Sequence, residues 1–462
     1  MFIMDIHEAL SFLEKRVAYG DVRYHERSVL TVRIVNGIVE SASFTKKHGY
    51  VIRAFDGGMR GVATGNDLSL DLVQRAVDAA KKGSGEKKLA ERKTEKGEFP
   101  YHYKIGPEDT DVEEFVKTLM ELHKETKMDG IVYSQTGGTI LVEKREIVTS
   151  DGAHLKAVVP VSGILQLSIA QKNGVMRRVY DSYNDLAGFE LFSREEAREL
   201  PKSISKLAID ALQAKPPKAG EYTVVLDPDI VGLLLHEAFG HASEGDIVAN
   251  KASVLLGKLG ERVASDLVTI IDSGNPKDVV NFEGSFYYVP FDDEGSIKKH
   301  TTVVENGILK GYLTSLDTAP ELGVDLSGNG RAQDHTHAPI VRQTNYFILP
   351  RDRNPEEMFE GISEGYYVLG RGAGGGQVDP AMGTFTFQAG PSYYIENGQI
   401  KYMVYGVLLS GQILDALKSV DAVGNDLRLT TSARGGCGKG GQLVKVGHGG
   451  PHVRLKLTIG GR

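Results

Sequence analysis

The stretch Asp227-Pro-Asp-Ile-Val-Gly-Leu-Leu-Leu-His-Glu-Ala-Phe-Gly-His241 decides the architecture of the C-terminal half of this 462-residue chain. Asp227 is a favourable N-cap residue, and Pro228 suits the first helical position, where its missing N–H costs nothing. Apolar residues between Ile230 and Phe239 surround nearly the whole helix, which predicts that the helix is buried. The alternating run from Glu221 to Leu226 predicts a strand that leads into it.

Three ionisable residues, His236, Glu237 and His241, lie within this apolar helix. Buried ionisable groups are costly unless they are paired or bind a metal, so three within six residues are hard to explain as packing. In the alternative interpretation, a buried histidine has its hydrogen bonds made within the core, and the neighbouring carboxylate has no role in a site. A zinc peptidase needs two imidazoles on one metal and a carboxylate that takes a proton from water. The trio therefore predicts a zinc-binding helix with Glu237 as the base.

The spacing of the two histidines sets a condition on the helix. Residues four apart differ by about 40° around a regular helix, whereas residues five apart, such as His236 and His241, differ by about 140°. Both can face one ion only if the helix widens in a π-bulge or unwinds at its end. Gly240 permits either change. The sequence thus predicts a helical defect from Ala238 to His241.

A catalytic zinc site uses three protein ligands and leaves one position open, so a third ligand is needed. The other eleven histidines and the single cysteine are candidates. Cys437 lies in Gly435-Gly-Cys-Gly-Lys-Gly-Gly441, a flexible and polar setting that does not suit a core thiol. Lys439 nearby would favour the thiolate form that binds zinc. An accidental loop cysteine and an unmetallated nucleophile remain as alternatives for Cys437.

The composition excludes several classes of protein. With 41% hydrophobic and 25% charged residues, the chain is globular, and its length predicts two or three domains. One cysteine cannot form an intrachain disulfide. Asp5 and Glu8 interrupt the region where a secretory signal needs apolar residues, and no segment approaches the roughly 20 apolar residues of a membrane span. A net charge of −7 without a dense basic stretch argues against nucleic acid as the partner. We expect a soluble cytoplasmic protein without membrane contact.

The order of patterns along the chain predicts the domain organisation. Residues 1–83 begin with a helical pattern and continue with alternating runs joined by Asn36-Gly37, a strong hairpin signal. Residues 84–99 are mostly charged, with both signs, and predict an exposed linker. Residues 100–219 repeat the helix-then-strands order, and residues 220–462 show short strands and glycine-rich turns. We therefore predict an α+β fold: an N-terminal α+β region of two similar halves, then a β-rich C-terminal domain that carries one buried zinc-binding helix.

Glycine is unusually frequent, at 55 of 462 residues or about 12% against a typical 7%. The stretch Gly370-Arg-Gly-Ala-Gly-Gly-Gly376 matches GxGxxG, but a dinucleotide fingerprint must open a helix, and the alternating Thr384-Phe-Thr-Phe387 follows instead. Gly374, Gly375 and Gly376 are better explained by close approach of an extended peptide backbone, as in β-augmentation, or by a plain glycine turn. We consider them candidate substrate-binding residues.

Two other polar groups are candidate site residues. Asp292, Asp293 and Glu294 could gather a hard cation, but between an aromatic run and Gly295 such residues more often form a hairpin turn. His335 and His337 would share a face only in a strand, where they could hydrogen-bond the substrate or a developing oxyanion. A structural role is the alternative for both histidines.

Four strings carry a resemblance to a known family: HEAFGH at His236, GGCGKGGQ at Gly435, PFDDEG at Pro290 and GRGAGGGQVDP at Gly370. Over essentially its whole length the chain resembles the TldD subfamily of the TldD/PmbA family. The resemblance implies a zinc metallopeptidase with one Zn²⁺ per active subunit. Carried over by position, it implies His236, His241 and Cys437 as the metal ligands and Glu237 as the catalytic base.

The resemblance also implies partners. TldD-type subunits commonly pair with a PmbA/TldE-type paralogue that lacks the zinc motif, so we expect a dimer, formed either with a second copy or with such a paralogue. The implied substrates are unfolded peptides that are threaded into an enclosed site. Two alternative functions remain from the residues: a non-catalytic subunit that binds peptide or partner, and a metal-independent cysteine hydrolase that uses Cys437.

Overall fold

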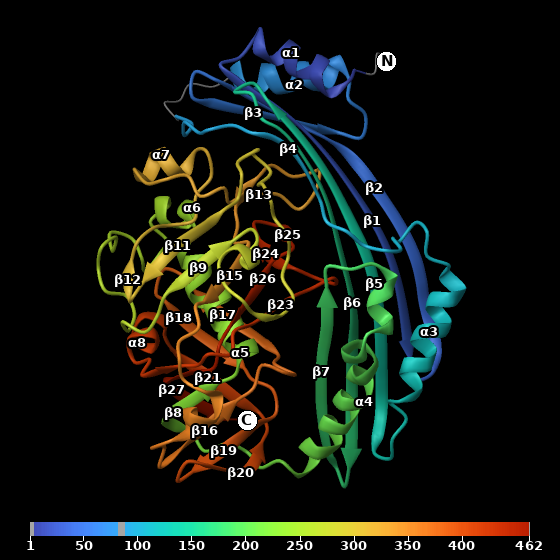
Figure 1. Cartoon of the computed structure of the whole chain (residues 1–462), viewed down its shortest axis with the longest axis vertical. Helices are drawn as coiled ribbons and strands as arrows, with labels where there is room; N and C mark the ends of the chain where they lie inside the picture. Colours follow the sequence, from blue (N-terminus) through green and yellow to red (C-terminus); the bar gives the residue numbers. More distant parts are fainter. Residues whose placement is uncertain (1–3, 82–87, 462) are drawn as a thin grey trace.

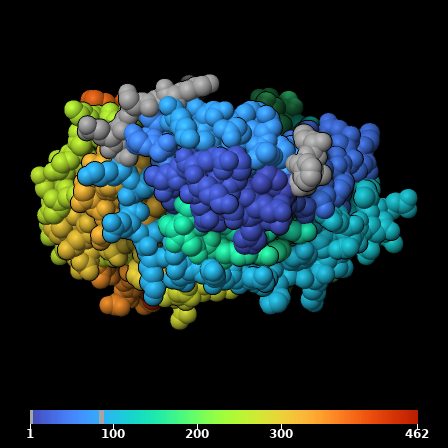
Figure 2. Space-filling model, turned by 90° about the horizontal axis from the view of Figure 1, so that it is seen from above, coloured from blue at the N-terminus to red at the C-terminus, as the bar shows by residue number. Residues whose placement is uncertain are grey.

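The computed structural model describes residues 4–81 and 88–461 and consists of two parts that lie side by side (Figure 1). A long curved sheet from the first half of the chain stands along one side, and the β-rich second half lies against it. Seen from above, the blue N-terminal atoms touch the yellow and orange atoms of the second half (Figure 2). This arrangement confirms the predicted α+β class.

The N-terminal part repeats one order of elements, a helix, three antiparallel strands and a helix. Its elements are α1 (Ile6–Glu14), β1 (Tyr19–Val35), β2 (Ile38–Asp56), β3 (Met59–Gly65), α2 (Leu70–Lys81), β4 (Lys96–Pro100), α3 (Val112–Lys124), β5 (Ile131–Thr149), β6 (His154–Lys172), β7 (Val175–Asp185), the 3₁₀ turn η1 (Phe189–Ser193), α4 (Glu195–Asp210) and the 3₁₀ turn η2 (Ala211–Gln213). The predicted similarity of the two halves is therefore visible in the order of elements. The two halves do not form separate sheets, however. Strand β1 pairs with β5, which gives one seven-stranded sheet in the order β3-β2-β1-β5-β6-β4, with β7 paired to β6.

Local sequence explains the hairpins of this sheet. Asn36 and Gly37 both have positive φ, at 49° and 80°, as the turn between β1 and β2 requires. Apolar residues alternate along β1, and Leu30, Val32 and Ile34 form a core with apolar residues of α3 and α4. The opposite face of the sheet packs against the second half of the chain through a separate apolar cluster that includes residues of β5 and β6.

The predicted linker at 84–99 overlaps strand β4 at its end, and residues 84–87 lie outside the described residues. Residues 96–100 form β4, which pairs in parallel with β6. Arg92 is buried, with Nε at 2.9 Å from Asp151 Oδ2 and Nη1 at 2.8 Å from the Glu294 carbonyl oxygen. The many charged side chains predicted an exposed linker, whereas Arg92 and β4 are held against the rest of the molecule. The division into 1–83, 100–219 and 220–462 stays a proposal, since the first two share one sheet.

The second half contains a nine-stranded sheet in the order β17-β18-β21-β27-β8-β16-β19-β20, with β22 paired to β27, and a seven-stranded sheet in the order β10-β23-β26-β15-β9-β11-β12. Two short ribbons, β13-β14 and β24-β25, complete it. The strands are β8 (Gly220–Leu226), β9 (Ile270–Ser273), β10 (Glu283–Gly284), β11 (His300–Glu305), β12 (Ile308–Leu309), β13 (Gly330–Arg331), β14 (Ile340–Val341), β15 (Asn345–Ile348), β16 (Glu364–Val368), β17 (Gly375–Asp379), β18 (Thr384–Gln388), β19 (Ser392–Glu396), β20 (Gln399–Val404), β21 (Val407–Gln412), β22 (Ala422–Val423), β23 (Arg428–Thr431), β24 (Cys437–Lys439), β25 (Gln442–Val444), β26 (Gly447–Gly450) and β27 (Val453–Gly461).

The helices of this half are α5 (Pro228–Leu234), the π-helix η3 (Leu235–Gly240), the 3₁₀ turn η4 (His241–Ser243), α6 (Gly245–Ala249), the 3₁₀ turn η5 (Pro276–Asp278), α7 (Thr318–Leu322), the 3₁₀ turn η6 (Pro355–Phe359) and α8 (Ile413–Lys418). Helix α5 is buried, as predicted. Asp227 caps it by accepting from the Ile230 N–H at 2.9 Å. A Cβ on Gly232 would lie 2.7 Å from the Gly449 Cα atom, so α5 rests directly on β26. Across the described residues, no helix is long and apolar enough to cross a bilayer.

Buried ion pairs join the two parts of the molecule. Asp292, Asp293 and Glu294 form the predicted hairpin turn, closed by a bridge between Phe291 and Ile297. The turn is not exposed, because arginines from the N-terminal sheet reach it. Three ion pairs connect them: Arg23 Nη1 to Asp293 Oδ1 at 3.0 Å, Arg145 Nη1 to Asp293 Oδ1 at 3.7 Å, and Arg53 Nη1 to Glu294 Oε1 at 2.5 Å. These arginines already neutralise Asp293 and Glu294, and Asp292 accepts hydrogen bonds from the backbone N–H groups of Glu294, Ser296 and Gly330.

We call these buried ion pairs, which join arginines of the N-terminal sheet to Asp293 and Glu294, the arginine seam. The stability that Asp293 contributes to the seam depends on pH. Burial alone would raise the pKa of Asp293, but Arg23 and Arg145 outweigh burial and lower it from 3.8 to about 2. Because the folded pKa lies below the unfolded value, the ionised carboxylate stabilises the fold above about pH 4. That contribution is lost as the pH falls from about 4 to about 2.

We expect Asp293→Asn to lower the free energy of unfolding by roughly 3 kcal/mol at pH 7, because two buried arginines lose their shared anion. The deficit should shrink as the pH approaches 3, where wild-type Asp293 begins to protonate. Urea unfolding between pH 7 and pH 3 measures this difference. Asp352→Asn, at an exposed position, is the control and should change stability by a few tenths of a kcal/mol. An equal deficit at every pH would contradict the assignment.

Candidate metal centre

The π-helix brings the two motif histidines together. Helix α5 widens into η3 at Leu235, and the His241 N–H donates to the His236 carbonyl oxygen, five residues back. The predicted defect is therefore present, but it begins three residues before the predicted Ala238. In a π-turn, residues five apart lie on one side of the helix. The imidazole ring centroids of His236 and His241 are accordingly 5.2 Å apart.

Gly240 and Gln343 hold the widened turn in place. Gln343 Nε2 donates to the His236 carbonyl oxygen at 2.9 Å, so that oxygen accepts a side-chain donor as well as the π-helical N–H. A Cβ on Gly240 would lie 2.2 Å from Gln343 Oε1 and 2.5 Å from its Cδ. Any larger residue at 240 must therefore displace Gln343. Gly240 is needed for this close approach, in addition to the helical freedom that the sequence suggested.

The hairpin β24-β25 carries Cys437 to the same point, 196 residues from His241 in sequence. The Cys437 Sγ atom lies 3.2 Å from His241 Nε2, and the potential ligand atoms of His236, His241 and Cys437 all lie within 4.8 Å of one another. All three residues are buried. Neither ring nitrogen of His236 has a hydrogen-bond partner among the described residues. An unpaired buried imidazole beside a thiol and a second imidazole fits a zinc ion, which takes nitrogen and sulfur ligands.

The thiol of Cys437 is poised to be anionic. Burial would raise its pKa, but His236 and His241 outweigh burial and lower it to about 4. The sequence pointed to Lys439 as the cause, and this was wrong. Lys439 Nζ instead binds Glu244 Oε2 at 2.9 Å and Asp246 Oδ1 at 2.6 Å.

Glu244 orients His241 and was not predicted from the sequence. Its Oε2 atom lies 2.8 Å from His241 Nδ1, which leaves His241 Nε2 directed toward Cys437. A carboxylate behind a histidine ligand is the usual partner that fixes the ring. Burial would raise the pKa of Glu244, but His241 and Lys439 lower it to about 2. The available signal was a glutamate three residues after His241, but nothing in the sequence distinguished it from the other acidic residues nearby.

Glu237 occupies the open side of the cluster. Its side chain is 35% exposed, whereas His236, His241 and Cys437 are buried, and its Oε2 atom lies 3.8 Å from His241 Nε2. The carboxylate can therefore reach both the cluster and a molecule that arrives from outside. This position suits a base that exchanges a proton with a reacting water.

His448 on β26 forms a wall of the centre that sequence reasoning did not single out. Its ring centroid lies 5.7 Å from that of His236, and burial, together with His236, lowers its pKa to about 3. It stays neutral at physiological pH and adds no positive charge beside the cluster. Its ring contacts the position where a Cβ on Gly232 would stand, which ties β26 to α5.

The remaining predicted site residues lie elsewhere. Gly375 and Gly376 begin β17, the edge strand of the nine-stranded sheet, which contacts the π-helix. Gly374 precedes it and donates its N–H to Gln388 at 2.8 Å. His335 and His337 lie in a loop after β13 rather than in a strand, and the His–Cys cluster contains neither. The Nδ1 atom of His337 lies 2.8 Å from Asp334 Oδ1, and His335 lines a separate cavity of about 290 Å³.

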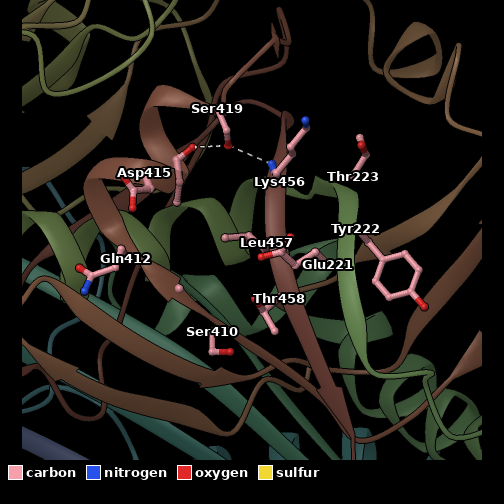
Figure 3. A pocket seen from close by; sticks show the side chains of 12 residues that line it. Glu221, Tyr222, Thr223, Ser410, Gln412, Asp415, Ser419, Lys456, Leu457 and Thr458 are labelled. Carbon is pink, nitrogen blue, oxygen red and sulfur yellow. Dashed lines mark hydrogen bonds between the residues drawn. The ribbon is translucent and has the colours of Figure 1, made fainter.

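A larger pocket, of about 610 Å³, lies over β8, β21, β27 and α8 (Figure 3). Its lining is mostly polar and includes Glu221, Ser410, Gln412, Asp415 and Lys456. It contains none of the residues of the metal centre, so its size carries no argument for the chemistry.

Two family models match the chain. The model described as "PmbA/TldA metallopeptidase C-terminal domain" matches residues 219–461, and the model for "PmbA/TldA metallopeptidase domain 1" matches residues 20–84. The chain belongs to the TldD/PmbA family of metallopeptidases. It is 34% identical over 452 residues to a metalloprotease of Methanocaldococcus jannaschii, covering 96% of each chain.

Two further relatives extend the comparison. A protein named "Zinc metalloprotease TldD homolog" from Saccharolobus solfataricus is 32% identical over 323 residues, which covers 69% of this chain and 67% of that protein. The crystal structure of TldE from Thermococcus kodakarensis has a TM-score of 0.77 at 20% identity, covering 98% of this chain and 99% of that one. The latter shows that the fold is shared.

Gly240→Ala should damage the centre without touching a candidate ligand. The added Cβ must displace Gln343, and the resulting overpacking is expected to cost about 1–3 kcal/mol of stability. Loss of the Gln343 bond to the His236 carbonyl should also weaken zinc binding by at least about 10-fold, as is typical when the support of a ligand is lost. Zinc competition titration and thermal unfolding measure the two effects. Gly311→Ala, where the nearest atom would be 3.8 Å away, is the control. Unchanged zinc affinity in Gly240→Ala would show that the π-helix does not position the ligands.

Proposed function

We propose that this protein is a zinc-dependent peptidase that hydrolyses unfolded peptides, with His236, His241 and Cys437 as ligands of one Zn²⁺ per chain. The observation that carries the proposal is the buried cluster of two imidazoles and one thiol with a partly exposed glutamate beside it. Three protein ligands leave one position for water and substrate, as catalytic zinc sites require. The name of the Saccharolobus relative supports the choice of metal.

Glu237 acts as general base and then as general acid. The zinc ion supplies Lewis acidity, which makes water nucleophilic and polarises the peptide carbonyl. The Glu237 carboxylate takes a proton from the attacking water and delivers it to the leaving amine. Glu244 holds the His241 ring in place through Nδ1, and its own charge is balanced by Lys439. Cys437 contributes a third donor that is already anionic at neutral pH, because its pKa is about 4.

An extended peptide fits the site through β17. This strand is the edge of its sheet, it follows Gly374 in the chain, and it contacts the π-helix that carries Glu237. Edge strands bind extended peptides by adding a strand, which requires an unfolded backbone. Folded proteins cannot present such a backbone, so we propose unfolded peptides as substrates. His335 and His337 keep their place in the proposal only as residues of a neighbouring loop.

We propose a cytoplasmic dimer as the working form. The fold is shared with TldE of Thermococcus kodakarensis, which supports pairing with a PmbA/TldE-type paralogue or with a second copy. A non-catalytic, peptide-binding role would not explain the retained cluster. One observation favours a second candidate function, a metal-independent cysteine hydrolase: the Cys437 thiol, with its low pKa, lies 3.2 Å from His241 Nε2.

Glu237→Gln should retain zinc and lose at least about 100-fold in kcat, since the amide cannot take the proton from water. Metal analysis and cleavage of an unstructured fluorogenic peptide measure the two quantities. Glu261→Gln, an exposed charge far from the cluster in sequence, should retain activity. Full activity in Glu237→Gln with zinc bound would contradict the base assignment.

Removing the metal with a chelator distinguishes the zinc peptidase from the metal-independent cysteine hydrolase. Removal of zinc should abolish activity, and added zinc should restore it, while Cys437→Ser should weaken zinc binding because it replaces a thiolate with a hydroxyl. Activity that survives complete metal removal but disappears in Cys437→Ser would support the cysteine hydrolase instead.

Binding of the peptide along β17 predicts an alternating pattern. In strand pairing only every second residue directs its N–H toward the neighbouring strand. A series of one peptide substrate, each member N-methylated at a single backbone nitrogen, should therefore show raised KM at alternate positions near the cleaved bond. Equal effects at adjacent positions would argue against strand addition.

A further inference from the structure

One long segment of the N-terminal sheet has no partner on its outer edge. Strand β2 pairs with β3 only from Tyr50 to Asp56, and no described strand pairs with its outer edge between Ile38 and Gly49. Every residue from 38 to 48 is exposed, although one edge of this segment pairs with β1. Ile38 and Phe44 are 73% and 46% exposed. In Figure 1, β2 runs along the outer side of the sheet. One face of this segment borders the second half, because Thr45 and Lys47 line the cavity that also contains His335.

The other outer strands of this sheet are shorter than this segment, and each is contacted by another part of the chain. The hydroxyl of Tyr405 bonds the backbone N–H and carbonyl of Arg178 on β7 at 3.2 and 2.9 Å. Strand β3 is seven residues long and lies against α2, where a Cβ on Gly61 would meet the Ala76 carbonyl oxygen at 1.9 Å. The Phe99 ring of β4 packs on Phe291 with centroids 6.0 Å apart. Proteins usually cover or shorten such edges, because unpaired backbone groups recruit other strands.

We propose that the outer edge of β2 is an interface with a second copy of this chain, in which Glu40–Lys46 pairs antiparallel with the same segment about a two-fold axis at Ser43. This proposal gives the dimer of the proposed function its contact surface, and it does not depend on the zinc chemistry. Symmetric pairing requires a segment that is complementary to itself. With Ser43 opposite its own counterpart, Glu40 of each copy faces Lys46 of the other.

The side chains of this segment are free enough to make these contacts. Glu40 and Lys46 are 48% and 39% exposed, although Glu40 already pairs with Arg33 at 2.7 Å and Lys46 with Glu108 at 3.0 Å. The same register sets Phe44 of one copy across from Ala42 of the other, twice. Each exposed ring then gains a neighbour, and cross-strand pairs of this kind stabilise sheets. Charge alone could have protected the edge, but only Glu40 is charged between residues 38 and 45.

Pairing in this way places the two metal centres on one side. The axis of an antiparallel strand pair lies perpendicular to the sheet at Ser43, so corresponding faces of the two copies point the same way. The second halves of both chains therefore lie on one face of a joined sheet, and both pairs of α3 and α4 lie on the other.

The test uses residue 43, which meets itself on the axis. Ser43→Lys should put two ammonium groups opposite each other and weaken the dimer at least about 10-fold. Analytical ultracentrifugation measures the dissociation constant, and circular dichroism checks the fold. Met176→Lys, on the exposed face of β7, is the matched control and should leave the dimer unchanged.

Charge exchange tests the register. Glu40→Lys and Lys46→Glu should each weaken the dimer, because each places like charges opposite one another at two symmetric points, and the double variant should restore it. A wild-type chain that is monomeric at micromolar concentration, or a dimer that Ser43→Lys leaves intact, would overturn the interface. Failure of the double variant to restore the dimer would overturn the register. None of these outcomes depends on peptidase activity, so the zinc proposal stands or falls separately.

Discussion

The spacing of five residues between His236 and His241 governs the rest of the catalytic half. A regular helix would direct these imidazoles to different sides, so the backbone must widen by one residue at that turn. Widening disrupts the regular hydrogen-bond pattern of the helix, and the surrounding structure must compensate for it. Gln343 does so by bonding the His236 carbonyl, and it can approach only because residue 240 has no side chain. The buried helix and the strands packed on it thus act together to hold the two imidazole rings in position.

Successive groups around the metal centre balance one another's charge, from the ligand cluster outward. The thiol and the two imidazoles lie innermost, Glu244 stands behind His241, and Lys439 neutralises Glu244 and Asp246 in turn. His448 closes one wall without adding a charge, because burial keeps it neutral. Glu237 is the exception, since it is the one member of the motif that solvent reaches. This asymmetry leaves a single carboxylate able to exchange protons with an arriving molecule.

Features that depend on neighbouring residues could be predicted from the sequence, whereas contacts between segments far apart in the chain could not. Asn36-Gly37 and Asp227-Pro228 fix a turn and a helix start through their own backbone preferences, so they were predicted correctly. The histidine spacing predicted a local defect of the helix, either a π-bulge or an unwound end, and the structure has the first of these. Residues 96–99 were included in the predicted linker because their charges can be read from the sequence, whereas their pairing with β6 cannot. Nor did Lys439 act on its sequence neighbour Cys437, because the fold placed two carboxylates within reach of the lysine.

The buried arginine seam also decides how the molecule can move. Arg23 and Arg53 cannot leave Asp293 and Glu294 without exposing unpaired charges to an apolar interior, which costs several kcal/mol for each ion. A hinge between the sheet and the second half is therefore closed to thermal fluctuation, and the two parts should melt in a single transition.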